Sequence, residues 1–312
     1  MESDNDTAVT EFVLLGFSGF CSLQRPLFWG VLCIYLVTLL GNSLIIVLTL
    51  ADPALHSPMY FFLCHFSLVE ILYTTTIVPR MLADLLSTHP TIPLVGCFTQ
   101  LYFFSFFGVI ECCLLAAMAY DRYAAICRPL HYTTLMNQRA QNSMVGASYF
   151  MGVITGSIHS ICIFTLPFHG ANIIYHYMCD VMPVLRLATA STFRGEVGKL
   201  IITVFFIVTP FLLIMTSYAC ILVTILGVTT SQGRRKVFST CSSHLFVVIL
   251  FFGSASVAYL RPESGSSLDT DQIYAFFYTV VTPMFNPFVY TLRNKEVTGA
   301  MRRLVHRFLW SP

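Results

Sequence analysis

The chain has 312 residues, of which 56% are hydrophobic and only 10% are charged, and its formal net charge is +2 at pH 7. A soluble domain carries about 25% charged residues, so this composition excludes an ordinary soluble protein. The mean hydropathy of +0.75 indicates a protein that lies in a lipid bilayer. We expect lipid around it and no nucleic-acid partner.

Seven apolar runs follow one another along the chain, each near the ~20 residues that a helix needs to cross a hydrocarbon core of ~30 Å. They lie at about residues 26–50, 58–80, 98–120, 142–166, 199–227, 237–260 and 272–292. A closed β-barrel would show alternating segments of about ten residues, whereas these runs are apolar on every face. We therefore predict an all-α membrane protein, a seven-transmembrane helix bundle over residues 25–292.

The segments between the runs predict the orientation. The side that holds residues 121–139, 228–236 and the C-terminal tail carries most of the Lys and Arg residues, whereas the other side has more acids than bases. By the positive-inside rule, residues 1–24 form an extracellular tail and residues 293–312 a cytoplasmic one. Asn5 lies in an Asn-Asp-Thr triplet of the outer tail and is a predicted glycosylation site.

The chain contains eleven cysteines, most of them in apolar runs. We interpret these as small core residues; they are Cys33, Cys64, Cys112, Cys113, Cys127, Cys162, Cys220 and Cys241. Cys97 at the outer end of the third run and Cys179 in the long outer loop 167–198 both face an oxidising compartment, which favours a disulfide between them. Cys21 remains as a free thiol. A metal site of His169, His176, Cys179 and Asp180 is the alternative for this loop.

Two acids lie inside the predicted membrane spans, Glu70 midway along the second and Glu111 midway along the third. An embedded charge costs several kcal/mol unless it is hydrated or paired. The carboxyl groups are therefore either protonated and hydrogen-bonded within the core, or they share a proton or a hard cation such as Na⁺.

One face of the third run joins such an acid to a charged pair. Its members follow one another at intervals of three or four residues, which places them in one stripe of a helix; they are Phe104, Gly108, Glu111, Leu115, Met118 and Arg122. By spacing alone, Asp121 and Arg122 are equally consistent with a plain interfacial ion pair and with the inner end of a buried polar stripe.

Several longer motifs occur in a fixed order between residues 41 and 294. They are Gly41-Asn42, PMYFFL at 58–63, MAYDRYAAIC at 118–127, Ser217-Tyr218, KVFSTCSSHL at 236–245 and PMFNPFVYTLRN at 283–294. With these motifs the sequence resembles an odorant receptor of the rhodopsin-like class A of G-protein-coupled receptors. The resemblance implies that residues 293–312 include a short amphipathic helix on the inner leaflet.

The resemblance implies a switch at the cytoplasmic end. Arg122 would be held by Asp121 at rest and freed to meet a G protein, while Tyr218 and Tyr290 move to support it. Pro287 would kink the seventh helix, because proline lacks an N–H and clashes with the preceding turn. The implied switch residues are Asp121, Arg122, Tyr123, Tyr218, His244, Asn286, Pro287 and Tyr290.

The resemblance also implies a ligand pocket in the outer half of the bundle. Its lining would be Phe104, Ser105, Gly108, Val109, Cys112, Ile202, Thr203, Phe206, Phe252, Ala255, Tyr259, Phe276 and Thr279. The alternative is that these side chains simply fill the core. The implied function is to bind a small volatile odorant and to activate a stimulatory, olfactory-type heterotrimeric G protein, which raises cyclic AMP. The implied location is the plasma membrane of the cilia of olfactory sensory neurons.

This chain departs from the resemblance at three places. His169 and Thr189 stand where two further loop cysteines are common, Phe252 replaces a frequent tyrosine, and Glu70 replaces a more usual aspartate. A channel or transporter that uses Glu70 and Glu111 on an ion path is the alternative function, although we see no pair of related halves. We expect no enzymatic activity and no cofactor, apart from a sodium ion at Glu70 and Glu111.

Overall fold

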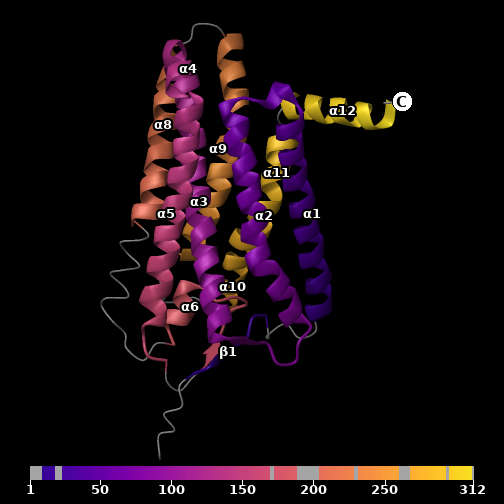
Figure 1. The fold of residues 1–312 in the computed structure, drawn as a ribbon, viewed down its shortest axis with the longest axis vertical. Helices are drawn as coiled ribbons and strands as arrows, with labels where there is room; N and C mark the ends of the chain where they lie inside the picture. Colours follow the sequence, from indigo (N-terminus) through magenta and orange to yellow (C-terminus); the bar gives the residue numbers. More distant parts are fainter. Residues whose placement is uncertain are drawn as a thin grey trace, which may run out of the picture.

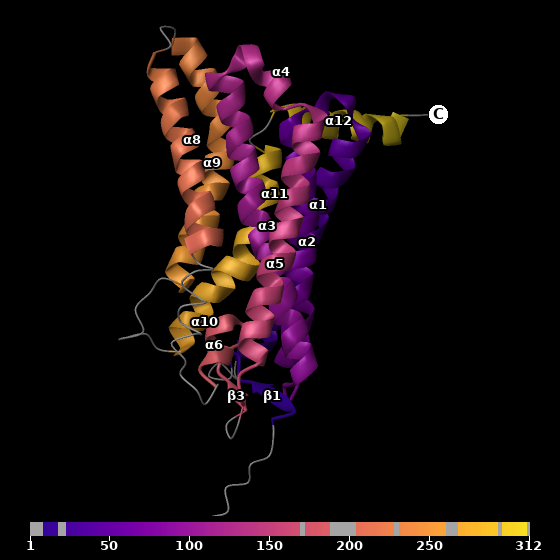
Figure 2. The same ribbon diagram turned by 60° about the vertical axis from the view of Figure 1, so that its left-hand side comes forward.

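The computed structural model describes residues 9–17, 23–168, 172–187, 204–227, 231–259, 268–292 and 295–310. Long helices stand side by side along the longest axis, with a small sheet at one end and helix α12 lying across the other (Figures 1 and 2). We name these the sheet end and the α12 end. The first described residues lie at the sheet end and the last in α12, at the opposite end of the bundle.

Within the described residues, six helices are long and apolar enough to cross a membrane. They are α1 (Gln24–Ala51), α2 (Pro58–Leu85), α3 (Leu94–Cys127), α5 (Gln138–Phe164), α8 (Thr209–Leu226) and α9 (Ser231–Tyr259). The last course through the bundle is divided into α10 (Leu268–Phe276), the π-helix η5 (Phe277–Val281) and α11 (Thr282–Leu292). Every predicted run overlaps one of these courses, which confirms the helical bundle.

Four short elements lie between the long helices: η2 (Pro53–Leu55), η3 (Pro129–His131), α4 (Tyr132–Leu135) and α6 (Val181–Leu185). The π-helix η4 (Val204–Val208) leads into α8, and the longer α12 (Lys295–Trp310) follows the last course. Polar contacts help to attach α12 to the bundle: Arg303 Nε donates to Asp52 Oδ2 at 2.8 Å, and the Tyr60 hydroxyl donates to Glu296 Oε2 at 2.7 Å. α12 therefore lies against the turn between α1 and α2.

Two helices extend well beyond the apolar runs that predicted them. α2 continues to Leu85, and α3 covers 34 residues up to Cys127. Hydrocarbon thickness limits the apolar stretch, whereas a helix satisfies its own backbone and can continue into water. α3 ends two residues before Pro129, as expected because the residue before a proline disfavours helical geometry.

The last course differs from the single helix predicted at 272–292, because a π turn interrupts it. The π-helix η5 ends two residues before Pro283, and the π-helix η4 likewise ends two residues before Pro210. A proline removes one hydrogen-bond donor and its ring presses on the preceding turn, and a wider turn accommodates both effects. Figure 2 shows α10 lying obliquely below α11.

The sheet was not anticipated from the sequence. It has the strand order β2-β1-β3, where β1 is Glu11–Leu14, β2 is Thr91–Pro93 and β3 is Ile173–Ile174. β1 runs antiparallel to β2, with Phe12 opposite Ile92, and parallel to β3, with Val13 opposite Ile173. We name residues 9–17, 91–93 and 172–187 together the cap.

The cap and the bundle have separate cores. A cluster around Phe12, Leu101, Phe168 and Cys179 lies inside the cap and against the adjoining ends of α3 and α5, and a much larger cluster fills the bundle. Large apolar side chains such as Leu40 are exposed on the perimeter of the bundle. An apolar perimeter is expected where lipid replaces water as the surrounding solvent.

The disulfide between Cys97 and Cys179 is present and ties α3 to the cap, which confirms that prediction. The cysteines of the apolar runs are free. The interpretation of all of them as core residues was wrong for Cys33, Cys162 and Cys220, which are exposed. A small apolar thiol on a lipid-facing surface costs nothing, so hydrophobicity alone does not predict burial there.

Candidate functional site

The polar face predicted for α3 points into the bundle. Phe104, Glu111, Leu115 and Met118 are all buried. α3 packs against α2, α5 and α8, so this one helix has neighbours on most of its circumference. A polar group on the inward face is therefore shielded from lipid and from bulk water, and it needs partners within the protein.

The charged pair lies at the α12 end of this face. Arg122 donates from Nε and Nη2 to Asp121 Oδ2, at 3.1 and 2.5 Å, and the Tyr132 hydroxyl donates to Asp121 Oδ1 at 2.8 Å. Burial, with the neighbouring Asp121 carboxylate, raises the pKa of Tyr132 above its ordinary value. Both oxygens of the fully buried Asp121 carboxylate thus accept hydrogen bonds, and the Arg122 guanidinium is paired with the residue directly before it in the sequence.

Tyr218, His244 and Tyr290 lie near Arg122, and none of the three is hydrogen-bonded to it. The Tyr218 hydroxyl is 2.6 Å from His244 Nδ1, and the two rings are stacked. The Tyr290 hydroxyl is buried and has no hydrogen-bond partner in the described part of the chain. This hydroxyl can take a new partner if the helices move.

A second polar group lies midway along the bundle. Asn286 of α11 donates through Nδ2 to Glu70 Oε1 of α2. Glu111 is close enough for the charge of Glu70 to act on it. One oxygen each of Glu70, Glu111 and Asn286 is buried and lacks a partner among the described residues. Unpaired buried oxygens are costly, so this place calls for water, a proton or a cation.

The oxygens fit a hard cation such as Na⁺, which prefers carboxylate and amide oxygen ligands. No group of three or more His, Cys, Asp or Glu side chains that could hold a metal occurs in the described ranges. Sodium at Glu70 and Glu111 therefore stays a prediction that rests on two carboxylates and one amide.

The Gly41-Asn42 motif brings α1 against α11. A Cβ atom at Gly41 would lie 2.8 Å from two atoms of the Pro287 ring, closer than real contacts allow. Asn42 turns its amide inward and donates to the Thr38 carbonyl oxygen at 3.1 Å. The first helix can therefore approach Pro287 this closely only with a glycine at position 41. This contact links two motifs that lie far apart in the sequence.

The predicted ligand residues fall into three groups. Phe104, Ser105, Cys112, Phe252, Ala255 and Thr279 are buried, and Gly108 and Phe276 are partly buried. Val109 packs against Cys113 and Met151 on the α5 side of α3. Ile202 and Thr203, and the side chains of Phe206 and Tyr259, lie outside the described residues. The structure thus brings parts of α3, α9 and the last course around one interior.

Two hydroxyls of this set already have partners. Ser105 Oγ is 2.9 Å from His159 Nδ1 of α5, and Thr279 Oγ1 is 2.9 Å from the hydroxyl of Tyr177 in the cap. A ligand that bonded to either hydroxyl would share it or displace the present partner.

Comparison with known proteins decides the family. A sequence model of the family described as "Olfactory receptor" matches residues 31–307. The chain belongs to the olfactory receptor family. Olfactory receptor 10P22 of Mus musculus is 74% identical, and Olfactory receptor 10P1 of Homo sapiens 58% identical, each over the full length of both chains. Family membership makes the chain a receptor rather than an enzyme, and a multi-pass protein of the plasma membrane.

The fold has a solved counterpart. The crystal structure of squid rhodopsin superposes with a TM-score of 0.70 and 15% identity, over 93% of this chain and 81% of that one. At this identity the likeness concerns the fold alone. It agrees with the seven-helix bundle.

Some interior residues of this olfactory receptor had no signal in the sequence. Tyr73 stacks on Phe104 with ring centres 5.5 Å apart, and Tyr278 meets Tyr73 edge-on at 6.4 Å. Tyr278, Thr279 and Val280 are buried in succession, because the wider π turn of η5 brings neighbouring residues to the same side. In a regular α-helix, only one or two of three consecutive residues would be expected to face the interior of the bundle.

The metal alternative for the loop of this olfactory receptor loses its thiolate, since Cys179 is bonded to Cys97. His176 is buried against the ring of Tyr177 and accepts from the Met178 N–H at 3.3 Å. Burial lowers the pKa of His176 to about 4. Its surroundings therefore favour the neutral ring for a packing reason. His169 and Thr189, where the loop departs from the family pattern, lie outside the described residues.

Proposed function

We propose that this olfactory receptor binds small volatile odorants inside the bundle near the sheet end and activates a stimulatory, olfactory-type heterotrimeric G protein at the α12 end, which raises cyclic AMP. The observation that carries the proposal is the continuous inward face of α3. It runs from Phe104, among the predicted ligand residues, through buried Glu111 to the Asp121–Arg122 pair. A single rigid helix can therefore couple events at the two ends.

The character of the interior supports a weak and broad odorant pocket. Its predicted walls are mainly aromatic and aliphatic, with hydroxyls at Ser105, Thr203, Tyr259 and Thr279. Apolar walls supply affinity, and sparse polar groups fix orientation. An odorant of about ten to twelve heavy atoms, at roughly 0.5 kcal/mol per atom, gains about 5 to 6 kcal/mol and binds at roughly tens to hundreds of micromolar.

The orientation we propose puts the sheet end outside the cell. The disulfide lies there, and disulfides persist in oxidising compartments. At the opposite end, α12 carries Arg302 and Arg303, as expected of an amphipathic helix on the cytoplasmic leaflet. Glycosylation of Asn5, which lies outside the described residues, and delivery to cilia belong to the same proposal.

The resting state of the switch is the arrangement around Asp121. With Arg122 and Tyr132 both bonded to it, the guanidinium is withheld from a partner protein. Activation would release Arg122 toward the G protein, with Tyr218 and Tyr290 as its new neighbours. The unpartnered Tyr290 hydroxyl supports this step, because forming a bond to a buried orphan group recovers a desolvation cost.

A cyclic-AMP reporter screen tests the proposal. Cells that display the tagged receptor are exposed to a panel of volatile compounds, beside cells that lack the receptor and cells that lack the stimulatory G-protein α subunit. We expect a ligand-dependent rise that needs both. A ligand-gated current that persists without the G protein would instead support the ion path through Glu70 and Glu111. Silence toward every volatile, at verified surface display, would count against the odorant proposal.

A further inference from the structure

The N-terminal segment enters the bundle after β1. At Gly16 and Phe17 the chain turns inward, and Phe17 is only 6% exposed. Its φ angle of 56° lies in the left-handed region, which is unusual for a bulky residue. A conformation of this kind persists only where surrounding contacts hold it. The contacts of Phe17 therefore show what the segment does.

Phe17 is bound from three directions. Its ring stacks on that of Tyr177, with centres 5.3 Å apart, and meets Phe276 edge-on at 6.0 Å. Its backbone N–H donates to Gln272 Oε1 at 2.9 Å in a buried hydrogen bond. Gln272 also donates to the Tyr175 carbonyl oxygen at 3.4 Å. One glutamine of α10 thus holds the N-terminal segment and the loop together.

Gly16 makes the close crossing possible. A Cβ atom there would lie 2.4 Å from Tyr177 Cα, so any side chain would push the two backbones apart. Because Gly16 has none, the N-terminal segment passes directly over Tyr177 and brings the next ring onto its face. The close passage of the two backbones at Gly16 therefore positions Phe17 to stack on Tyr177.

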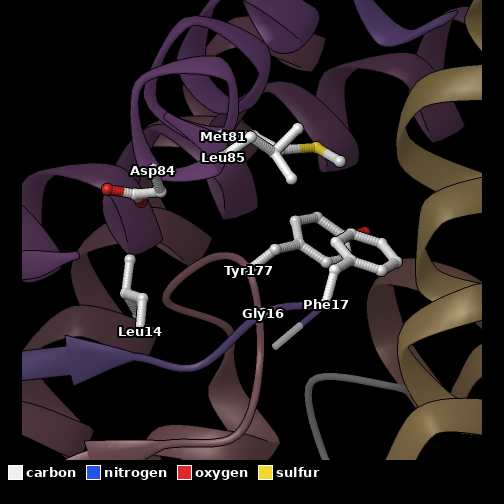
Figure 3. A pocket seen from close by; sticks show the side chains of 7 residues that line it. All are labelled: Leu14, Gly16, Phe17, Met81, Asp84, Leu85 and Tyr177. Atoms are coloured by element: carbon white, nitrogen blue, oxygen red, sulfur yellow. The ribbon is translucent and has the colours of Figure 1, made fainter. Parts of the chain in front are cut away.

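The stacked rings close the sheet end of the interior. Figure 3 shows the rings of Phe17 and Tyr177 face to face, with Met81 of α2 directed toward them. The space between this part of the cap and α2 is a cavity of about 10 Å³, lined by Leu14, Gly16, Phe17, Met81, Asp84, Leu85 and Tyr177. A void of that size holds about one water molecule, so an odorant cannot pass between them as they stand.

Phe17 and Tyr177 both contact predicted pocket residues, from the sheet end of the bundle. Phe17 contacts Phe276, and the Tyr177 hydroxyl bonds to Thr279. Phe17, Tyr177 and Phe276 all pack with the core of the bundle. Phe12, in the same segment, packs instead with Phe168 in the smaller cluster between the cap and the ends of α3 and α5, with ring centres 5.5 Å apart. Phe12 therefore belongs to the smaller cluster at the cap, and Phe17 belongs to the core of the bundle.

We propose that Phe17 and Tyr177 form the roof of the odorant pocket, and that Phe17 is a specificity-determining residue supplied by the N-terminal segment. The inference rests on the proposed function. The ligand it implies is an apolar volatile whose ring or alkyl end packs against these two aromatic side chains. Loss of the Phe17 ring should enlarge the pocket at the roof, so longer ligands gain and shorter ligands lose.

The test compares Phe17→Ala with Phe12→Ala, which removes the same ring from the same segment but from the cap core. Both are displayed on cells at matched surface levels, and cyclic-AMP responses are measured for straight-chain alcohols and aldehydes from pentanol to undecanal, beside the agonists of the wild type. Loss of an aromatic pair should shift half-maximal concentrations about two- to twelvefold for Phe17→Ala, with the order of potency changed. Phe12→Ala should lower surface yield and keep that order.

A ligand-independent measurement accompanies this test. In a Cys21→Ser background, Thr279→Cys is treated on intact cells with a membrane-impermeant methanethiosulfonate. We expect slow labelling, made faster by Phe17→Ala and not by Phe12→Ala. If Phe17→Ala does not reach the surface, Phe17→Gly replaces it, because glycine adopts the left-handed backbone without strain.

The outcomes separate the two proposals. If the wild type answers no volatile in the reporter screen, the odorant function fails and this inference fails with it. If the wild type responds, but loss of the Phe17 ring changes neither the order of potency nor the labelling of Thr279→Cys, the roof is wrong and the odorant function stands. Equal changes in the Phe12 and Phe17 variants would also overturn the roof, since they would reflect loosening of the whole cap.

Discussion

The two ends of the bundle are held by different kinds of contact. At the sheet end, a disulfide, a three-stranded sheet and stacked aromatic rings join the cap to the helices. At the α12 end, the contacts include ion pairs and hydrogen bonds, such as those of Arg122 with Asp121 and of Arg303 with Asp52.

This difference suggests how the work is divided. Covalent and tightly packed apolar contacts do not exchange partners readily, whereas a charged group can exchange one polar partner for another and stay paired. We therefore expect the sheet end to keep its structure during signalling, apart from local movement of the roof, and the α12 end to rearrange.

The largest effect is expected from removing the disulfide at the sheet end. Cys97→Ser or Cys179→Ser should abolish the surface-displayed receptor, because a native disulfide contributes about 2 to 5 kcal/mol, a large share of the stability of a domain. Flow cytometry of an N-terminal tag measures the loss. Cys21→Ser is the matched control and should be nearly silent. A surface receptor with Cys179 found as a free thiol by mass spectrometry would contradict the prediction.

Breaking the α12 end should separate signalling from folding. Arg122→Ala should reach the surface and lose its ligand-evoked cyclic AMP, because the guanidinium that would meet the G protein is gone. Arg303→Ala is the control at the same end. Its pair with Asp52 is about half exposed on the arginine side, and such pairs contribute about 0 to 1 kcal/mol, so signalling should persist. Normal signalling by Arg122→Ala would refute the switch.

The polar group midway between the two ends sharpens the comparison. A cation at Glu70 and Glu111 that binds the resting bundle better should favour that state. Raising sodium against an inert replacement salt should then move the odorant response of the wild type to higher concentrations, and leave Glu111→Gln unmoved. Equal shifts in both receptors, or none in either, would favour carboxyl groups that are protonated and hydrogen-bonded.

The smallest effects concern the hydroxyls beneath the roof. Ser105→Ala, Thr279→Ala or Tyr259→Phe should weaken oxygenated agonists about two- to twelvefold, the equivalent of one hydrogen bond of about 0.5 to 1.5 kcal/mol. Ser105→Ala also leaves His159 without its partner, so hydrocarbon analogues serve as the control for packing. If all three variants respond unchanged to every oxygenated agonist, the predicted pocket is misplaced.

Local pattern and bilayer thickness were sufficient to predict the number and order of the helical courses. The stripe from Phe104 to Arg122 follows from a helical period within one element, and its burial agrees with the structure. The disulfide could be predicted because only a few cysteines lie outside the apolar runs. Each of these inferences uses either neighbouring residues or a property of the solvent, both of which are readable along a single chain.

Tertiary structure alone decided the contacts between distant residues. Phe17 bonds to Gln272 across 255 positions, and Asn286 bonds to Glu70 across 216. The strand at Glu11–Leu14 forms because β2 and β3 offer it edges, and the π turn at Phe277–Val281 turns Tyr278 and Thr279 inward together. Such pairings depend on how the helices pack. The packing energy is shared among many residues that are distant in the sequence, so a local sequence period cannot predict it.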